Sequence, residues 1–284
     1  MKVLQFTTIM MCLSAILFTQ EEQTEVTEPV FGWANRLSGT LNLTQASFDN
    51  WAQGGENSMA WQLNINGTFD YNQDKYKWSN STKIAYGESK IGSNDAIKSI
   101  DELKLESVYS YKFGIPVNPY LSLTGETQMM PGYQYGDSID IRISNFLDPG
   151  YFTQGIGAGI EPTKEIKTRL GFALKETVAD VFVSYTDDPG TEKIEKIRIE
   201  PGIESVTDLT AKISENIMFT SKLELFSNVK RFDEIDVKWD NIFLAEVSPY
   251  IDVNFNVKLF YDKDITKNRQ LKQALSLGLT YNFL

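Results

Sequence analysis

The residues that could do chemistry in this sequence are carboxylates and amines, because the chain contains no histidine. Mechanisms with a histidine base and sites with a histidine metal ligand are therefore excluded. The single cysteine, Cys12, lies in an N-terminal segment that we expect to be cleaved. The sequence has no glycine-rich phosphate loop and no Asp-x-Asp-x-Asp-Gly calcium loop. These features favour a protein that is not an enzyme and that uses no metal or cofactor.

Charged residues alternate with apolar residues along most of the chain, and they form the predicted functional surface. Apolar residues at every second position, as at Trp61, Leu63 and Ile65, are typical of a strand with one apolar and one polar face. If the apolar faces contact lipid, the interleaved residues line a lumen. The lumen-lining candidates are Lys104, Glu106, Glu126, Lys167, Arg169, Arg198, Glu200, Glu224, Lys238, Asp240 and Asp252. The same alternation places Asp208, Lys222 and Lys258 on the inner face.

Both signs of charge occur among these candidates. A basic stripe on two adjacent segments is made of Lys167, Arg169, Lys175 and Arg198. Such a stripe could attract a small anion. Because Glu200 follows on the same segment, we favour local neutralisation of the stripe. The expected lumen is thus either a salt-bridged plug or a narrow polar pore.

The elements that must position these side chains are long strands. Strands that cross a membrane at a tilt need about 9–11 residues, whereas strands of soluble proteins average about 5–6. The alternation predicts twelve strands, at residues 37–45, 59–71, 77–87, 102–113, 117–128, 151–161, 166–176, 195–213, 217–227, 235–247, 249–261 and 271–283. We therefore predict an all-β fold, a single up-and-down antiparallel transmembrane β-barrel of about 12 strands.

The connections between the predicted strands alternate between short turns and long loops. The short ones lie at 72–76, 114–116, 162–165, 214–216 and 248, and the long ones at 46–58, 88–101, 129–150, 177–194, 228–234 and 262–270. Outer-membrane barrels have short periplasmic turns, longer external loops and an even number of strands. The alternation of short turns with long loops therefore indicates a barrel whose N-terminus and C-terminus both lie on the periplasmic side.

The two ends of the chain indicate export to a bacterial outer membrane. Residues 1–20 resemble a signal peptide, with Lys2 before an apolar stretch that is too short for a transmembrane helix. Residues 21–36 are expected to form an N-terminal periplasmic extension, and residues 37–284 the barrel. The segment 276–283 resembles the C-terminal signal that the barrel-assembly machinery reads, although Leu284 follows the final aromatic residue, Phe283.

A soluble β-sandwich or lipocalin-like barrel is the main alternative fold, since its strands also alternate. In that fold the apolar face would point into a core. Aromatic residues near the predicted strand ends, such as Tyr71, Tyr76 and Trp78, resemble the interfacial girdles of membrane barrels instead. The net charge of −11 argues against a surface that binds nucleic acid.

Several local strings resemble the DUF3078 family of Bacteroidetes-type exported proteins, a family of unknown function. They are Gln45 to Asn57 (QASFDNWAQGGEN), Ala85-Tyr86-Gly87, Thr127-Gln128, Pro131-Gly132-Tyr133 and Ser144 to Tyr151 (SNFLDPGY). The resemblance implies an exported barrel-like protein and supplies no activity. The loop-motif candidates are Trp51, Gly54, Gly55, Asn57, Gly132, Tyr133, Asn145, Phe146 and Pro149. The last string could form either a constriction in the lumen or a surface loop.

The function favoured by the sequence is a narrow channel or transporter for small polar solutes. A barrel of about 12 strands lies between the smallest barrels, which fill their own interior, and the 16–18-stranded porins. A closed barrel with an adhesion, scaffold or envelope-assembly role is the first alternative. A soluble periplasmic β protein that binds a hydrophobic ligand is the second. The expected partners are outer-membrane lipid, the barrel-assembly machinery and a small polar solute, and not nucleic acid.

Overall fold

The computed structural model describes residues 31–49, 52–53, 55–136, 139–188, 190–232, 234–263 and 268–284. The predicted signal peptide, most of the predicted extension, Trp51 and Gly54 lie outside these residues. Within the described ranges, no helix has the length and apolar character needed to cross a membrane.

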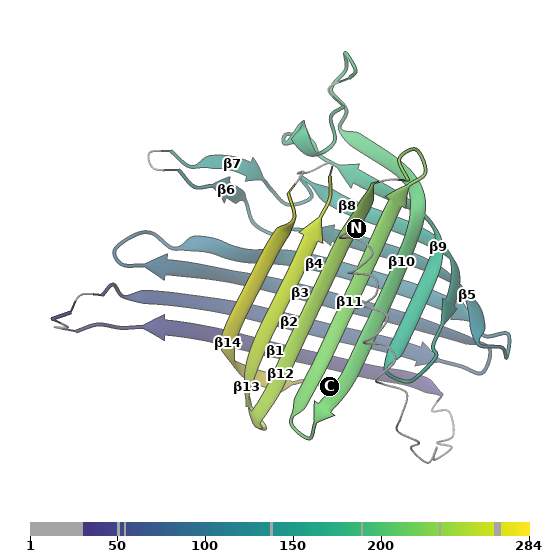
Figure 1. Ribbon diagram of the computed structural model, residues 1–284, viewed down its shortest axis with the longest axis horizontal. Helices are drawn as coiled ribbons and strands as arrows, with labels where there is room; N and C mark the ends of the chain where they lie inside the picture. The colour runs from purple at the N-terminus through teal and green to yellow at the C-terminus, as the bar shows by residue number, and fades with distance from the viewer. Residues whose placement is uncertain are drawn as a thin grey trace, which may run out of the picture. The chain divides into compact units, whose positions relative to one another are not determined.

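Twelve of the described strands form a closed antiparallel barrel (Figure 1). They are β1 (Gly32–Ala46), β2 (Ser58–Asn72), β3 (Tyr76–Ile91), β4 (Ile97–Tyr111), β5 (Val117–Thr127), β8 (Gly150–Ile160), β9 (Ile166–Val178), β10 (Ile197–Ser214), β11 (Ile217–Asn228), β12 (Ile235–Ser248), β13 (Ile251–Tyr261) and β14 (Gln270–Asn282). Each strand pairs with the next one in this series, and β1 pairs with β14 to close the barrel. The predicted up-and-down transmembrane barrel of twelve strands is confirmed.

The two ends of the barrel differ in their connections. At the short-turn end the strands are joined by residues 73–75, 112–116, 161–165, 215–216 and 249–250. At the long-loop end they are joined by residues 47–57, 92–96, 128–149, 179–196, 229–234 and 262–269. The connection 128–149 contains a hairpin, β6 (Gly132–Gln134) and β7 (Ile141–Ser144), which forms a two-stranded sheet separate from the barrel (Figure 1). A short 3-10 helix, η2 (Val183–Tyr185), lies in the connection 179–196.

Two predicted boundaries were wrong, and cross-strand pairing explains both. The loop predicted at 88–101 is shorter, because Ser58 pairs with Ile91 and Ser89 pairs with Ile97, so that β3 and β4 continue beyond the predicted strand ends. The first strand begins at Gly32, inside the predicted extension, where Trp33 pairs with Tyr71. In these extensions the backbone hydrogen bonds between strands continue, although the alternation of apolar and polar side chains is weak there.

The polarity of the barrel is the reverse of that of a soluble protein. Large apolar side chains such as Leu121, Phe172 and Leu275 are more than half exposed on the outer face. Polar and charged side chains such as Glu106 and Asp252 are buried inside. The strand registers place Trp61, Phe255 and Leu279 on the outer face as well, in phase with these exposed apolar residues. An apolar outer face suits contact with lipid, and a polar inner face suits a lumen.

Aromatic side chains form a cluster on the outer face near the short-turn end. The ring centroids of Trp33 and Tyr71 lie 5.0 Å apart, those of Tyr71 and Tyr76 6.0 Å, and those of Tyr76 and Tyr109 5.7 Å. Tyr and Trp rings present an apolar body and a polar group, which suits the boundary between lipid and water. The cluster therefore marks one membrane interface.

Glycines on the inner face of β8 and β9 leave room for larger polar side chains. A Cβ on Gly155 would collide with the Glu204 carboxylate, and a Cβ on Gly171 would collide with the Tyr120 hydroxyl. Over these glycines, which have no side chain, the Tyr120 hydroxyl donates a 3.1 Å hydrogen bond to the Glu204 carboxylate. The glycines thus allow a buried tyrosine and a buried carboxylate to pack against the wall.

We expect Phe255→Arg to reduce the free energy of unfolding by about 2–4 kcal/mol, because it places a cation in the lipid-facing belt near the middle of β13. The matched control is Asn256→Arg, whose side chain points to the lumen and lies beside Asp240. This control should cost much less. Unfolding by urea of barrels refolded into liposomes measures both, and equal costs would contradict the assignment of the faces.

Candidate functional site

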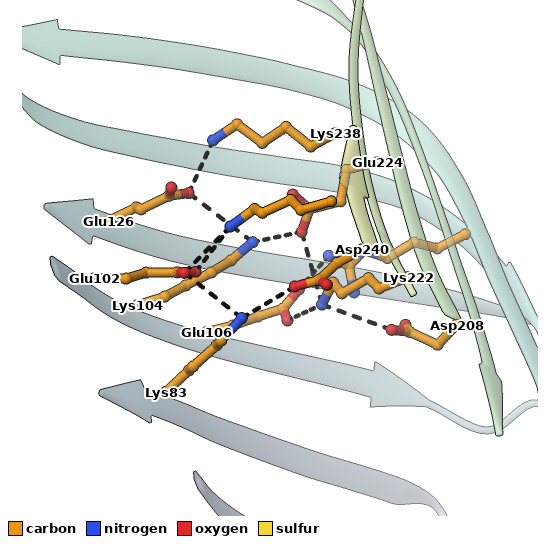
Figure 2. Close-up of polar contacts among 12 residues, drawn as sticks. Lys83, Glu102, Lys104, Glu106, Glu126, Asp208, Lys222, Glu224, Lys238 and Asp240 are labelled. Atoms are coloured by element: carbon orange, nitrogen blue, oxygen red, sulfur yellow. Dashed lines mark hydrogen bonds and ion pairs between the residues drawn. The ribbon is translucent and has the colours of Figure 1, made fainter. Parts of the chain in front are cut away.

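A layer of charged side chains crosses the lumen and is the clearest candidate for a functional site. It contains twelve residues, most of which are labelled in Figure 2, namely Lys83, Glu102, Lys104, Glu106, Glu126, Arg169, Asp208, Lys222, Glu224, Lys238, Asp240 and Lys258. Strands β3, β4 and β5 supply five of them from one wall, and β9 to β13 supply the others from the facing wall. We call this set the ion-pair layer.

The larger part of the ion-pair layer centres on Glu106. Its carboxylate accepts hydrogen bonds from both Arg169 and Lys222. Lys104 lies 2.6 Å from Glu224, and Lys222 lies 3.7 Å from the same carboxylate. Glu106 and Lys104 belong to β4, whereas Lys222 and Glu224 belong to β11. Apart from the Lys222–Glu224 contact within β11, these contacts join strands that are not neighbours in the barrel, so the side chains span the lumen.

A second, separate part of the layer contains two lysines and two carboxylates. Lys83 on β3 lies 3.0 Å from Asp240 on β12 and 3.5 Å from Glu102 on β4. Lys258 on β13 lies 3.2 Å from Glu102. Asn256 donates a 2.6 Å hydrogen bond to Asp240 and holds that carboxylate in place. Each charge in this group therefore has an opposite charge beside it.

The ion-pair layer carries no net formal charge. Its six cations, Lys83, Lys104, Arg169, Lys222, Lys238 and Lys258, are matched by six carboxylates. The Glu106 side chain is only 8% exposed, whereas Asp208 at the edge is 41% exposed. Buried charges are tolerated when they are paired and hydrogen-bonded. The layer can therefore close the lumen without leaving an unpaired buried charge.

The structure places every predicted lumen residue on the inner face, but at different levels. Seven belong to the ion-pair layer: Lys104, Glu106, Glu126, Arg169, Glu224, Lys238 and Asp240. Arg198 and Glu200 form a 2.9 Å pair toward the long-loop end. Lys167 and Asp252 lie toward the short-turn end, where Thr280 donates a hydrogen bond to Asp252.

Sequence reasoning did not single out Lys83 and Glu102, although both belong to the layer. The signal of Lys83 is weak because the inner positions around it hold small or neutral residues, such as Ser81 and Ala85. Glu102 has the same phase as Lys104 and could have been found from it. The predicted basic stripe is divided between separate partners. Arg169 pairs with Glu106, while Lys175 pairs with Asp236 at 2.8 Å and with Asp262 at 3.0 Å.

A cavity of about 390 Å³ lies at the long-loop end, above the ion-pair layer. We call it the vestibule. Its lining residues are Lys98, Asp101, Glu102, Glu126, Thr127, Gln128, Gly132, Tyr133, Tyr135, Ile143, Ser144, Pro149, Tyr151 and Tyr185. Three of the family strings thus meet here, including the predicted loop residues Gly132, Tyr133 and Pro149. A smaller cavity of about 90 Å³ is lined by layer residues and shares Glu126 and Tyr151 with the vestibule.

The other loop-motif residues have local roles in the described structure. Asn57 accepts a 2.6 Å hydrogen bond from the Phe48 backbone N–H. Gly55 has a φ of +147° and packs so closely on the Phe48 ring that a Cβ would collide with it. The backbone of Asn145 pairs with that of Asp148, and Phe146 is half exposed. This segment forms the rim of the vestibule and leaves Phe146 on the surface.

Asp148 holds two long connections together beside the vestibule. Its carboxylate is buried and accepts hydrogen bonds from the backbone N–H groups of Asp180, Val181 and Phe182, at 3.0, 2.9 and 3.2 Å. Thr127 donates a 3.1 Å hydrogen bond to the carbonyl of Pro149 and ties the same segment to β5. Residues 128–149 and 179–196 are thereby joined into one rim.

We expect Glu106→Gln to lower the free energy of unfolding by about 2–3 kcal/mol, because it leaves Arg169 and Lys222 without their shared carboxylate. Asp208→Asn is the matched control, since Asp208 is more exposed and lies 3.7 Å from Lys222. Its cost should stay below about 1 kcal/mol. Tryptophan fluorescence during urea unfolding gives both values, and a smaller loss for Glu106→Gln than for the control would refute the central role of Glu106.

We expect Asp148→Ala to loosen the rim, because three backbone N–H groups lose their acceptor. Cleavage of the connection 179–196 by a protease should become several times faster, while the barrel strands stay protected. The control Glu192→Ala changes an exposed side chain of the same connection. Limited proteolysis followed by mass spectrometry locates the cuts, and identical cleavage rates in the two variants would count against this role.

Residues 43–133 match the family model described as "Protein of unknown function (DUF3078)". The resemblance predicted from the sequence is confirmed over this range. The string from Ser144 to Tyr151 lies beyond the matched residues, although it packs beside Thr127 in the structure. A comparison with curated proteins gave no match.

Solved structures that resemble this chain include a translocator domain, an outer membrane channel and a porin. The translocator domain of autotransporter NalP from Neisseria meningitidis is 8% identical with a TM-score of 0.39, over 99% of this chain and 95% of that chain. The COG4313 outer membrane channel from Pseudomonas putida F1 is 7% identical with a TM-score of 0.41, over 93% and 99%. The NanC porin is 7% identical with a TM-score of 0.40, over 86% and 97%.

Proposed function

We propose that this protein is an outer-membrane β-barrel that acts as a narrow channel for small polar solutes, with the ion-pair layer as its gate. The observation that supports the proposal most directly is that, among the described residues, side chains and not backbone segments cross the lumen at the ion-pair layer. At the level of the layer the lumen is crossed by flexible lysine, arginine and carboxylate side chains from the walls. Such side chains can change partners while the strands remain paired.

The cost of rearranging the ion-pair layer supports this mechanism. Removing one partner of a buried ion pair is costly, whereas exchanging one partner for another keeps the charge paired. Lys222 already lies within 4.0 Å of three carboxylates, those of Glu106, Asp208 and Glu224. A lysine with several acceptors can exchange one for another at low cost. A polar solute or ions entering the layer can therefore replace some of these contacts.

The two cavities support a path along the barrel axis. The vestibule opens at the long-loop end, and the smaller cavity is lined by layer residues such as Lys104 and Arg169. Glu126 and Tyr151 line both cavities, so the two lie next to each other. A solute in the vestibule would meet the ion-pair layer next. The lining combines charged and hydroxyl-bearing side chains with aromatic ones, which suits small polar molecules that also have some apolar surface.

The proposed location follows from the outer surface and the two chain ends. The apolar outer face requires a lipid environment, and the predicted signal peptide together with the final strand fits export to the bacterial outer membrane. The strand β14, which contains most of the signal-like segment 276–283, pairs with β1 and closes the barrel. We propose that this strand is recognised by the barrel-assembly machinery.

A closed barrel with a scaffold, adhesion or envelope-assembly role is the second candidate. The neutral, hydrogen-bonded ion-pair layer favours it, because such a layer also stabilises a permanently filled lumen. In that case the connections 128–149 and 179–196, which form the rim, would make the contacts with other molecules. Conductance measurements separate the two candidates.

In planar bilayers we expect the native barrel to show small, salt-dependent conductance steps, since salt screens the ion pairs. The double variant Lys104→Ala/Glu224→Ala removes one cross-lumen pair and keeps the net charge, so its conductance should rise severalfold. The matched control is Arg231→Ala/Glu234→Ala, which removes a 2.9 Å pair in the connection 229–234. This control should conduct like the native protein.

Heat-modifiable gel mobility shows whether each variant is folded. Folded barrels that conduct in neither the native nor the Lys104→Ala/Glu224→Ala form would overturn the channel and leave the closed barrel.

A further inference from the structure

Four tyrosines surround the vestibule, and they come from three separate segments of the chain. Tyr133 belongs to β6 and Tyr135 directly follows it, Tyr151 belongs to β8, and Tyr185 ends η2. Tyr133 and Tyr135 are each about two-fifths exposed, and their ring centroids lie 6.3 Å apart. Aromatic rings with a polar edge are well suited to contact a ligand that has both apolar and polar surfaces.

The charged groups of the vestibule are already engaged with each other or with the ion-pair layer. Lys98 lies 2.8 Å from Asp101. The Asp101 carboxylate also accepts hydrogen bonds from the backbone N–H groups of Met129 and Met130. Glu102 and Glu126 point to the lysines of the layer, Glu102 at 3.2 Å from Lys258 and Glu126 at 2.8 Å from Lys238 (Figure 2). A charged ligand would have to disrupt one of these pairs. A neutral ligand would not.

Neutral hydrogen-bonding groups complete the lining. Gln128 carries an amide that contacts Lys98 at 3.3 Å and the carbonyl of Asn145 at 3.4 Å, so both contacts are long. Tyr135 accepts a hydrogen bond from the backbone N–H of Lys98 at 3.1 Å and keeps its own hydroxyl proton to donate. The vestibule therefore offers both donors and acceptors next to aromatic faces.

We infer that the vestibule is a binding site for a neutral saccharide of one or two sugar rings. The inference deepens the proposed function and rests on it, because it names the class of solute that the channel would accept. A sugar ring has an apolar face of C–H groups, which packs on tyrosine rings, and a rim of hydroxyls, which donate and accept hydrogen bonds. The cavity volume of about 390 Å³ falls within the range of about 300–1,000 Å³ that is usual for small-molecule sites.

Other solute classes fit the vestibule less well. Among the described lining residues, an anion would face three carboxylates, those of Asp101, Glu102 and Glu126, and one cation, Lys98. A cation would compete with the lysines that these carboxylates already hold. A hydrocarbon would displace water from the polar side chains of Gln128 and Ser144 and offer them no hydrogen bond in return, which costs free energy.

The test is calorimetric titration of the full-length protein, folded in detergent, with maltose as the neutral probe. Glucosamine and glucuronate serve as cationic and anionic sugar probes of similar chemistry. We expect maltose to bind more tightly than either charged probe. Tyr133→Ala should weaken maltose binding by at least about tenfold, and Tyr133→Phe should weaken it less, since the ring remains.

Two further variants guard against indirect effects. Tyr185→Ala removes a second ring from a different connection and should also weaken maltose binding, whether or not Tyr133→Ala disturbs the β6–β7 hairpin. Tyr281→Ala removes a tyrosine from the outer face at the short-turn end and should leave binding unchanged. Equal losses in Tyr281→Ala and Tyr185→Ala would overturn the assignment of the site.

Binding and conductance are measured separately, so the inference and the proposed function can fail independently. Conductance without maltose binding, or tighter binding of glucuronate or glucosamine, overturns the neutral saccharide and leaves the channel. Maltose binding that depends on Tyr133 and Tyr185, in a barrel that never conducts, supports the site and overturns the channel.

Discussion

The structure depends on the need to pair every backbone N–H and C=O group of a strand that faces lipid. A bilayer core offers no water to satisfy these groups, and an open sheet edge there would be costly. The pairing of β1 with β14 over Ser38–Leu43, for example Leu41 with Leu279, closes the sheet. Once the sheet is closed, alternate side chains must point to lipid or to the lumen. The apolar outer face and the polar interior both follow from this closure.

Closure also creates the electrostatic problem that the ion-pair layer solves. Charged side chains on the inner face of a barrel of this width are brought near those of the facing wall, where water is limited. Strands β4 and β11 are far apart in the sequence and are not neighbours in the barrel, yet Lys104 and Glu224 lie 2.6 Å apart. An equal number of cations and carboxylates lets these charges be buried together. The arrangement that pairs these charges also brings side chains from facing walls into contact across the lumen.

The long-loop end is built differently from the barrel wall. Its shape depends on side chains that accept backbone hydrogen bonds, above all Asp148 and Thr127, and less on strand pairing. The rim therefore holds several tyrosines around a cavity without the regular spacing of a sheet. The wall is thus a regular scaffold of paired strands, whereas the rim is an irregular surface built by connections, the part of a protein that most often varies.

The sequence by itself determined the barrel, because a repeat of two residues is a local property that one strand shows without its neighbours. All twelve strands, their antiparallel order and the difference between the two ends could be predicted in this way. The inner position of Glu106 also followed from the phase of its own strand. Only the tertiary structure decided that Glu106 meets Arg169 and Lys222, because barrel closure sets the distances between facing walls. The vestibule likewise required the folded chain, since Tyr133, Tyr151 and Tyr185 come together through loops that have no periodic pattern.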